Sequence, residues 1–130
     1  MLTQVVVAGA LICDRGLLVA QRARPPELAG LWELPGGKVA AGESDADALA
    51  RELREELGVE VRVGARLGDE VTLSPTMTLR AYRVTLTAGT AHPHDHRALR
   101  WVSRGDLQDL PWVPADTAWL PDLDRALAES

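Results

Sequence analysis

The segment from residue 37 to residue 59 constrains the fold more strongly than any other part of the chain, because it predicts one amphipathic helix between two glycines. It reads GKVAAGESDADALARELREELGV. Ser44 is a helix-capping residue with Asp47 three positions later, and Gly58 is placed to end the helix. The apolar residues that recur at helical spacing, and so predict a face packed on a sheet, are Ala46, Leu49, Ala50, Leu53 and Leu57.

Three glutamates lie on roughly the opposite side of this predicted helix: Glu52, Glu55 and Glu56. Residues three and four positions apart share a helix face, so Glu55 and Glu56 both flank Glu52. Acidic runs of this kind are usually solvated faces. Crowded carboxylates also repel one another unless a cation lies among them, and Mg²⁺ takes oxygen ligands alongside substrate phosphates. The segment therefore raises the hypothesis of a magnesium site for phosphate chemistry.

The fixed residues of this segment are spaced as in the pattern G-x5-E-x7-R-E-U-x-E-E-x-G-U, where U is aliphatic. The residues that fill it are Gly37, Glu43, Arg51, Glu52, Leu53, Glu55, Glu56, Gly58 and Val59. This pattern is the Nudix box, and so many identities at set gaps make a specific signal. The chain resembles a Nudix hydrolase over nearly its whole length. The resemblance implies a single domain over residues 1–130, with an α/β fold built as an α/β/α sandwich around a mixed β-sheet.

The rest of the chain also favours an α/β fold. The continuous apolar run from residue 5 to residue 12 predicts a strand buried on both faces, and Asp14-Arg15-Gly16 predicts a turn into the next strand. The expected strands cover residues 5–12, 17–21, 31–34, 59–63, 69–73, 78–86 and 98–102, and further helices are expected to open at Ser103 and to cover residues 122–128.

Composition limits the classes of function. With 130 residues, of which 46% are hydrophobic, the chain can build one compact core. Its net charge of −5 disfavours broad electrostatic binding to nucleic acid or to an anionic membrane. Cys13 is the only cysteine, which excludes an internal disulfide, and no apolar run approaches the ~18 residues that span a bilayer. We expect a cytoplasmic protein, monomeric or weakly dimeric, that acts on a small-molecule nucleotide.

The resemblance also implies the reaction and its cofactor. Nudix enzymes hydrolyse a nucleoside diphosphate linked to another group, and metal ions can activate water and clamp phosphate oxygens. We expect Mg²⁺, with Mn²⁺ as an alternative, bound by Glu52, Glu55 and Glu56 and by the carbonyl group of Gly36. Glu52 is either a ligand or the general base. The catalytic candidates are the same three glutamates.

Three further residues of the box region have expected roles. Arg51 is expected to pair with a glutamate of the box and to orient it. Glu43 is a candidate peripheral metal ligand. Lys38 is the only lysine of the chain and directly follows the glycine pair, so we consider it a candidate phosphate ligand, with a solvated surface lysine as the alternative.

The run RARPPELAGLWELPGGK resembles the MutT-like nucleoside triphosphate pyrophosphohydrolases and the bacterial CTP pyrophosphohydrolases near them. Arg22 falls where this group carries an arginine that faces the nucleotide, and an ordinary arginine at a strand end is the alternative. Glu33 precedes the Leu-Pro-Gly-Gly turn, as in these relatives, and is expected to help order the metal site. Both residues are candidate contacts on the substrate side.

Asp116 ends the run WVPAD, a setting in which MutT-type enzymes carry a base-reading asparagine. A carboxylate accepts hydrogen bonds, so it prefers a base edge that donates them. The exocyclic amine of cytosine is such a donor, and guanine offers its N1–H and its 2-amino group. The alternative role of Asp116 is a helix N-cap.

Asp95 lies in the loop segment HPHDHRALRW, at a place where relatives often carry an acid near the metal site. His92, His94 and His96 alternate around it, and histidines of a flexible loop more often face solvent than bind a transition metal. The tryptophans are expected in the core or the pocket wall, and stacking on a base is an open alternative for one of them: Trp32, Trp101, Trp112 and Trp119.

The resemblance implies hydrolysis of a (d)NTP to the (d)NMP and pyrophosphate, with water attacking the β-phosphorus. CTP, dCTP, 5-methyl-dCTP and 8-oxo-dGTP are the expected substrates, and the activity would clean or balance the nucleotide pool. ADP-ribose is the alternative substrate, because that branch of the family tends to carry a proline downstream of the box, where Pro75 lies. A non-catalytic Nudix-like binding module is a further alternative, although such modules usually lose box acids that this chain keeps.

Overall fold

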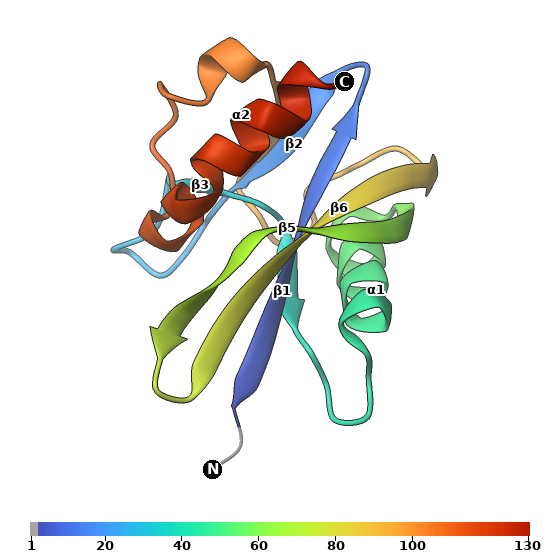
Figure 1. Ribbon diagram of the computed structural model, residues 1–130, viewed down its shortest axis with the longest axis vertical. Coiled ribbons are helices and arrows are strands. Elements are labelled where there is room, and N and C mark those ends of the chain that lie inside the picture. Colours follow the sequence, from blue (N-terminus) through green and yellow to red (C-terminus); the bar gives the residue numbers. More distant parts are fainter. Residues whose placement is uncertain (1–2) are drawn as a thin grey trace.

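The computed structural model describes residues 3–130, which form a seven-stranded sheet with helices on both faces (Figure 1). The strands are β1 (Gln4–Cys13), β2 (Gly16–Gln21), β3 (Trp32–Glu33), β4 (Gly36–Lys38), β5 (Glu60–Ser74), β6 (Met77–Ala88) and β7 (Ala98–Val102). The helices are α1 (Asp45–Leu57) and α2 (Leu120–Ala128), with 3₁₀ turns η1 (Arg104–Asp106) and η2 (Pro114–Trp119).

Strand β1 is the centre of the sheet, whose main strand order is β3-β2-β1-β6-β5. It pairs in parallel with β6, from Gln4 opposite Met77 to Leu11 opposite Val84, and antiparallel with β4 and β2. Strand β7 pairs antiparallel with β2, and β5 pairs antiparallel with β6. The sheet is therefore mixed, as the sequence predicts.

Alternating side chains of β1 separate two hydrophobic cores. Val7 and Leu11 pack in the core that α1 covers, whereas Ala8 and Ala10 face the other core. Trp119, at the start of the C-terminal helical region, is fully buried in this second core. Figure 1 shows α1 and α2 on opposite faces of the sheet. The predicted α/β/α sandwich is confirmed.

Helix α1 begins and ends where the sequence predicts. The Ser44 hydroxyl accepts a hydrogen bond from the amide of Asp47 at 3.1 Å, and Gly58 ends the helix with a φ of 72°, which favours glycine. The buried residues of the helix are Ala48, Leu49, Leu53 and Leu57. The expected stripe is wrong at Ala46, which is exposed.

Strand β5 differs from the prediction of two separate strands at residues 59–63 and 69–73. It is one strand of 15 residues, and register shifts against β6 interrupt its pairing near residues 64–65 and 68–70. Such bulges insert unpaired residues without ending a strand, so the glycines at 64 and 68 mark bends rather than a loop. The resulting long hairpin carries its tip to the edge of the cavity described below.

The C-terminal helix starts at Leu120, two residues earlier than predicted, with Pro121 in its first turn, where proline is well accommodated. The indole nitrogen of Trp119 donates to the carbonyl of Asp69 at 2.9 Å and so fastens this region to β5. No helix between residues 3 and 130 is long and apolar enough to cross a bilayer.

Candidate active site

Two adjacent glycines let helix α1, named here the acidic helix, lie close to the sheet. Gly36 and Gly37 belong to β4, named here the glycine strand, where they pair with Ala8 and Val7 of β1. A Cβ atom on Gly37 would overlap the carboxyl group of Glu52, and a Cβ atom on Gly36 would overlap the carbonyl oxygen of Val7. Glycine therefore leaves the room in which Glu52 lies against β4.

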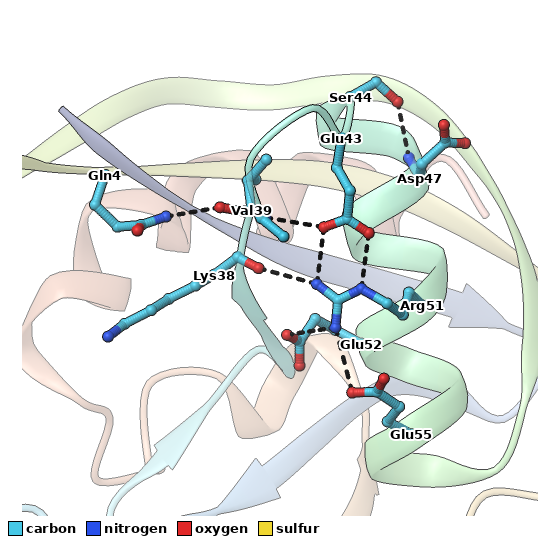
Figure 2. A network of polar contacts seen from close by, with 10 residues as sticks. Gln4, Lys38, Val39, Glu43, Ser44, Asp47, Arg51, Glu52 and Glu55 are labelled. Atoms are coloured by element: carbon cyan, nitrogen blue, oxygen red, sulfur yellow. Dashed lines mark hydrogen bonds and ion pairs between the residues drawn. The ribbon is translucent and has the colours of Figure 1, made fainter. Parts of the chain in front are cut away.

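Arg51 is the centre of the acidic network in Figure 2. Its Nε and Nη2 atoms donate to the two oxygens of Glu43 at 2.7 and 2.9 Å. Its Nη1 atom donates to Glu52 at 3.1 Å and to Glu55 at 3.3 Å, and Nη2 also donates to the carbonyl of Lys38 at 3.2 Å. One guanidinium group contacts three carboxylates, which confirms the expectation that Arg51 pairs with glutamates of the box.

Both carboxylate oxygens of Glu43 accept hydrogen bonds from Arg51. The hydrogen bonds from Arg51, together with one from the amide of Ala40 at 2.9 Å, lower the pKa of Glu43 to about 2. The same contact raises the pKa of Arg51. Because both oxygens of Glu43 accept hydrogen bonds from the protein, we assign Glu43 the role of an anchor for Arg51.

Glu56 has a different environment from its neighbour Glu55. Its Oε2 atom is buried and has no hydrogen-bond partner among residues 3–130. Burial is the main reason that the pKa of Glu56 rises to about 7, and the charges of nearby carboxylates add to the rise while His96 opposes it. A buried acceptor without a partner is rare, and a bound cation would supply the missing partner.

The oxygen atoms gathered here fit a hard divalent cation. Carboxylates on one helix turn, beside the backbone of a glycine strand, offer the oxygen ligands that Mg²⁺ takes. Within residues 3–130, no three acidic, histidine or cysteine side chains converge as a ready cage, and both Glu52 and Glu55 are turned toward Arg51. Arg51 contacts one oxygen of each carboxylate, Oε1 of Glu52 and Oε2 of Glu55, so the other oxygen of each stays available to a metal ion.

A cavity of about 670 Å³ opens beside the glycine strand. This volume is within the size range of small-ligand pockets. Strand β4 contributes Gly36, Gly37 and Lys38 to its lining, and the start of η2 contributes Asp116. The apolar part of the lining consists mainly of Val6, Leu28, Leu34, Leu73, Met77, Leu79 and Val113. An apolar cavity with a few polar groups is the usual form of a site for a small organic ligand.

Glu33 joins two basic residues at the edge of this cavity. It accepts hydrogen bonds from Arg22 at 3.1 Å and from the Nε2 atom of His96 at 2.9 Å. The His96 side chain is only 9% exposed, so the expectation that these histidines face solvent is wrong for His96. Burial would lower the pKa of His96, but the hydrogen bond and charge of Glu33, with the charge of Glu56, raise it.

Asp116 is buried, at 4% exposure, and its carboxyl group lines the cavity. Its Oδ2 atom accepts from the amide of Leu34 at 2.8 Å, and it makes no capping hydrogen bond within η2. The alternative role as a helix N-cap is therefore wrong, because β3 and β4 bring a free backbone amide to the carboxylate. Burial raises the pKa of Asp116 to about 7.

Lys38 and Asp95 have contrasting positions. Lys38 is exposed, lines the cavity and makes no ion pair within residues 3–130; Figure 2 shows its side chain extending away from Arg51. Asp95 is 62% exposed, lies outside the cavity lining and pairs with Arg24 at 2.7 Å. The structure thus brings Arg22, Glu33, Lys38 and Asp116 together around one cavity and places Asp95 outside its lining.

None of the four tryptophans belongs to the cavity lining, and Trp112 and Trp119 lie in the core, one of the two expected places. Trp112 is buried and donates its indole hydrogen to the carbonyl of Leu107 at 2.8 Å. The tip of the β5–β6 hairpin instead supplies Leu73 and Met77, which sequence reasoning missed. Leu73 is the one exposed large hydrophobic residue in the described chain, at 41%, and a leucine beside a Ser-Pro-Thr turn gave no sign of this role.

Comparison with known proteins identifies the architecture that holds these residues. A model of the NUDIX domain matches residues 3–123, a range that includes the glycine strand, the acidic helix and Asp116. The chain belongs to the Nudix family. Nudix hydrolases are generally dependent on divalent metals. The predicted family and the predicted enzyme class, a Nudix hydrolase, are confirmed.

Two curated relatives and one solved structure are similar to this chain over most of its length. A Mycobacterium tuberculosis protein named "Putative 8-oxo-dGTP diphosphatase 2" is 61% identical over 130 residues, covering 98% of this chain and 92% of its own. The CTP pyrophosphohydrolase of Escherichia coli is 43% identical over 126 residues, with 95% and 90% covered. The solution structure of the E. coli ORF135 protein superposes with a TM-score of 0.78 at 37% identity, covering 98% of this chain and 91% of that one.

Proposed function

We propose that this Nudix hydrolase is a nucleoside triphosphate pyrophosphohydrolase, which converts a (d)NTP into the (d)NMP and pyrophosphate. One observation carries the proposal: a single cavity is lined both by the glycine strand that contacts the acidic helix and by the buried carboxyl group of Asp116. The first part suits phosphates with a metal ion, and the second suits a base. The names of the relatives, which refer to 8-oxo-dGTP and CTP, support this substrate class.

We assign Mg²⁺, or Mn²⁺ as an alternative, to the carboxylates of Glu52, Glu55 and Glu56 and to the carbonyl of Gly36. When bound, the ion lowers the pKa of a water molecule and neutralises phosphate oxygens. Glu52 lies beside the glycine strand, which supports its assignment either as a ligand or as the general base for water that attacks the β-phosphorus. Burial raises the pKa of Glu56 to about 7, so a cation bound there would favour its ionised form.

Asp116 is the residue that we assign to the base. Its Oδ2 atom is occupied by the amide of Leu34, so the remaining oxygen is the acceptor available to a ligand in the cavity. Cytosine and guanine are among the bases whose edges donate to such an acceptor, and they are the bases that the names of the relatives refer to. CTP, dCTP, 5-methyl-dCTP and 8-oxo-dGTP are therefore the substrates that we propose, with Leu28, Leu73 and Met77 packing against the base.

Lys38 and Arg22 are the cations that we assign to the phosphates and the sugar side of the nucleotide. Lys38 lines the cavity without an ion pair among residues 3–130, so its ammonium group is available to an anionic ligand. Arg22 lines the same cavity, and Glu33 holds it in place. Asp95 stays a candidate substrate contact from outside the cavity lining, since its charge acts on Glu56.

The test is hydrolysis by the purified protein with Mg²⁺, scored as pyrophosphate against phosphate release. The substrate series is CTP, dCTP, 5-methyl-dCTP, dGTP, 8-oxo-dGTP, UTP and ADP-ribose. We expect pyrophosphate from the cytosine nucleotides or 8-oxo-dGTP, at higher kcat/KM than from UTP. Turnover of ADP-ribose alone would contradict the proposal and favour the alternative that Pro75 raised.

The proposal extends to the setting of the reaction. We propose that residues 1–130 act as a single domain, as a monomer or weak dimer, in the cytoplasm, where hydrolysis of damaged or excess nucleotides keeps them out of DNA. The acidic net charge of −5 supports a small nucleotide rather than nucleic acid or membrane as the partner. Light scattering of the protein as it elutes from a size-exclusion column measures the oligomeric state directly.

A further inference from the structure

Residues 89–97, named here the histidine loop, connect β6 to β7. The loop carries His92, His94 and His96, whose alternation had no assigned role. Its contacts fall into two groups, one with the end of α1 and one with Gln21 at the end of β2 and Glu33 of β3.

On one side the histidine loop caps the end of α1, where backbone carbonyls lack partners within the helix. The amide of His92 donates to the carbonyl of Leu57 at 2.9 Å, and the amide of His94 donates to that of Glu56 at 3.2 Å. The Nδ1 atom of His94 lies 2.9 Å from the carbonyl oxygen of Glu55. Since a carbonyl oxygen can only accept, this nitrogen carries the hydrogen. The loop thereby holds the backbone of two proposed metal ligands.

On its other side the histidine loop is fixed to the cavity. The Nε2 atom of His96 donates to Glu33 at 2.9 Å, and the same carboxylate holds Arg22. The amide of Arg97 donates to the carbonyl of Gln21 at 2.8 Å, at the end of β2. A displacement of the loop therefore shifts both the metal-binding helix end and the arginine of the cavity.

We propose that the histidine loop is a positioning element, in which His94 places the metal-binding end of α1 and His96 places Glu33 and its arginine partner. The inference rests on the proposed function, because it concerns the same metal and nucleotide. Two buried side-chain atoms have no hydrogen-bond partner among residues 3–130: Oε2 of Glu56, on α1, and Nδ1 of His96, on the histidine loop. The Glu56 and His96 side chains also interact through their charges. Neither His94 nor His96 needs to touch the substrate for this role.

Substitution by asparagine or glutamine tests which ring nitrogen of each histidine makes the important hydrogen bond. Asparagine keeps a donor near the place of Nδ1, and glutamine keeps one near the place of Nε2. We therefore expect His94→Asn to behave as the wild type and His94→Gln to be impaired, with the reverse order at His96. His92→Ala is the matched control, because His92 contributes its backbone amide, and its side chain makes no hydrogen bond within residues 3–130.

Three readouts distinguish the two halves of the loop. Mn²⁺ affinity is measured without nucleotide from the electron paramagnetic resonance of the free ion, and amide hydrogen exchange is measured at residues 54–58. For His94→Gln we expect about tenfold weaker Mn²⁺ binding and faster exchange at the helix end. For His96→Asn we expect the KM for dCTP to rise by about tenfold, with Mn²⁺ affinity within about twofold of the wild type.

The outcomes that overturn the proposal are distinct from those that overturn the function. Wild-type Mn²⁺ affinity and exchange in His94→Gln would refute the role of His94, and an unchanged KM in His96→Asn would refute that of His96. Equal loss in both amide variants at one position would refute the hydrogen-bond basis. If the wild type bound no Mn²⁺, or Glu56→Gln bound it equally well, the proposed metal site would fail, while hydrogen exchange would still test the loop.

Discussion

Replacing Glu56 by glutamine should stabilise the metal-free protein while removing most of its activity. Burial raises the pKa of Glu56 from 4.5 to about 7, so its ionised form is disfavoured in the folded state. Each pKa unit corresponds to ~1.4 kcal/mol, and with allowance for partial exposure the ionised carboxylate costs the folded protein roughly 2–3 kcal/mol. Glutamine has a similar shape and carries no charge, so it avoids this cost.

The sign of the effect with pH follows from the direction of the shift. Below pH 4.5 the group is protonated in both the folded and the unfolded chain, and Glu56 adds no penalty. Between pH 4.5 and about 7 the folded chain holds the proton while the unfolded chain loses it, so the free energy of unfolding of the wild type falls as the pH rises. The full penalty is present above this range.

The assay is urea unfolding of both proteins with a chelator present, at one pH below and one pH above this range. We expect the variant to be more stable by roughly 2–3 kcal/mol at the higher pH and nearly equal at the lower pH. The control is Glu27→Gln on the exposed loop, which should show no such pH dependence. With Mg²⁺ the variant should lose kcat by orders of magnitude. A variant that is less stable than the wild type at the higher pH would refute the argument.

Three other substitutions test separate contacts of the site. Gly37→Ala should lower kcat at least about tenfold and weaken Mn²⁺ binding, because the new methyl group overlaps the Glu52 carboxyl group; normal kcat would contradict that contact. Arg51→Lys should lower kcat/KM by roughly ten- to a hundredfold, because an ammonium group cannot hold Glu43 and Glu52 together in fork geometry, and steady-state kinetics measure the loss. Burial raises the pKa of Asp116 to about 7, so the wild-type KM for dCTP should rise as the pH falls through this value and the carboxylate loses an acceptor site. Asp116→Asn should remove that dependence, and parallel KM profiles for the two proteins would count against base reading by the carboxylate.

The local signals of residues 37–59 were sufficient to predict the structure of the segment. Ser44 and Gly58 bound the helix because capping and left-handed backbone depend on residues within one turn. Arg51 reaches the glutamates because all but one of its partners lie within eight residues of it along the chain. The central strand was equally clear, because an apolar run buried on both faces leaves few other arrangements.

Features that depend on distant pairings were not predicted. The burial of His96 requires the carboxylate of Glu33, which lies 63 residues away in sequence, and the contact of Asp116 with the Leu34 amide spans 82 residues. The cavity wall at Leu73 depends on the bulged register of β5 against β6, which no local pattern encodes. Local sequence patterns therefore predicted the elements that carry the candidate residues better than the residues that surround them.

The central claim is that one cavity holds the base at Asp116 and the phosphates at the glycine strand. The most direct measurement is a crystal structure with Mg²⁺ and a dCTP analogue that carries a non-hydrolysable bridge between the α- and β-phosphates. We expect the cytosine amine within hydrogen-bond distance of Asp116, and the phosphates with their metal between Gly36 and the carboxylates of Glu52 and Glu56. A base bound away from Asp116, or phosphates bound without contact to this helix, would contradict the account.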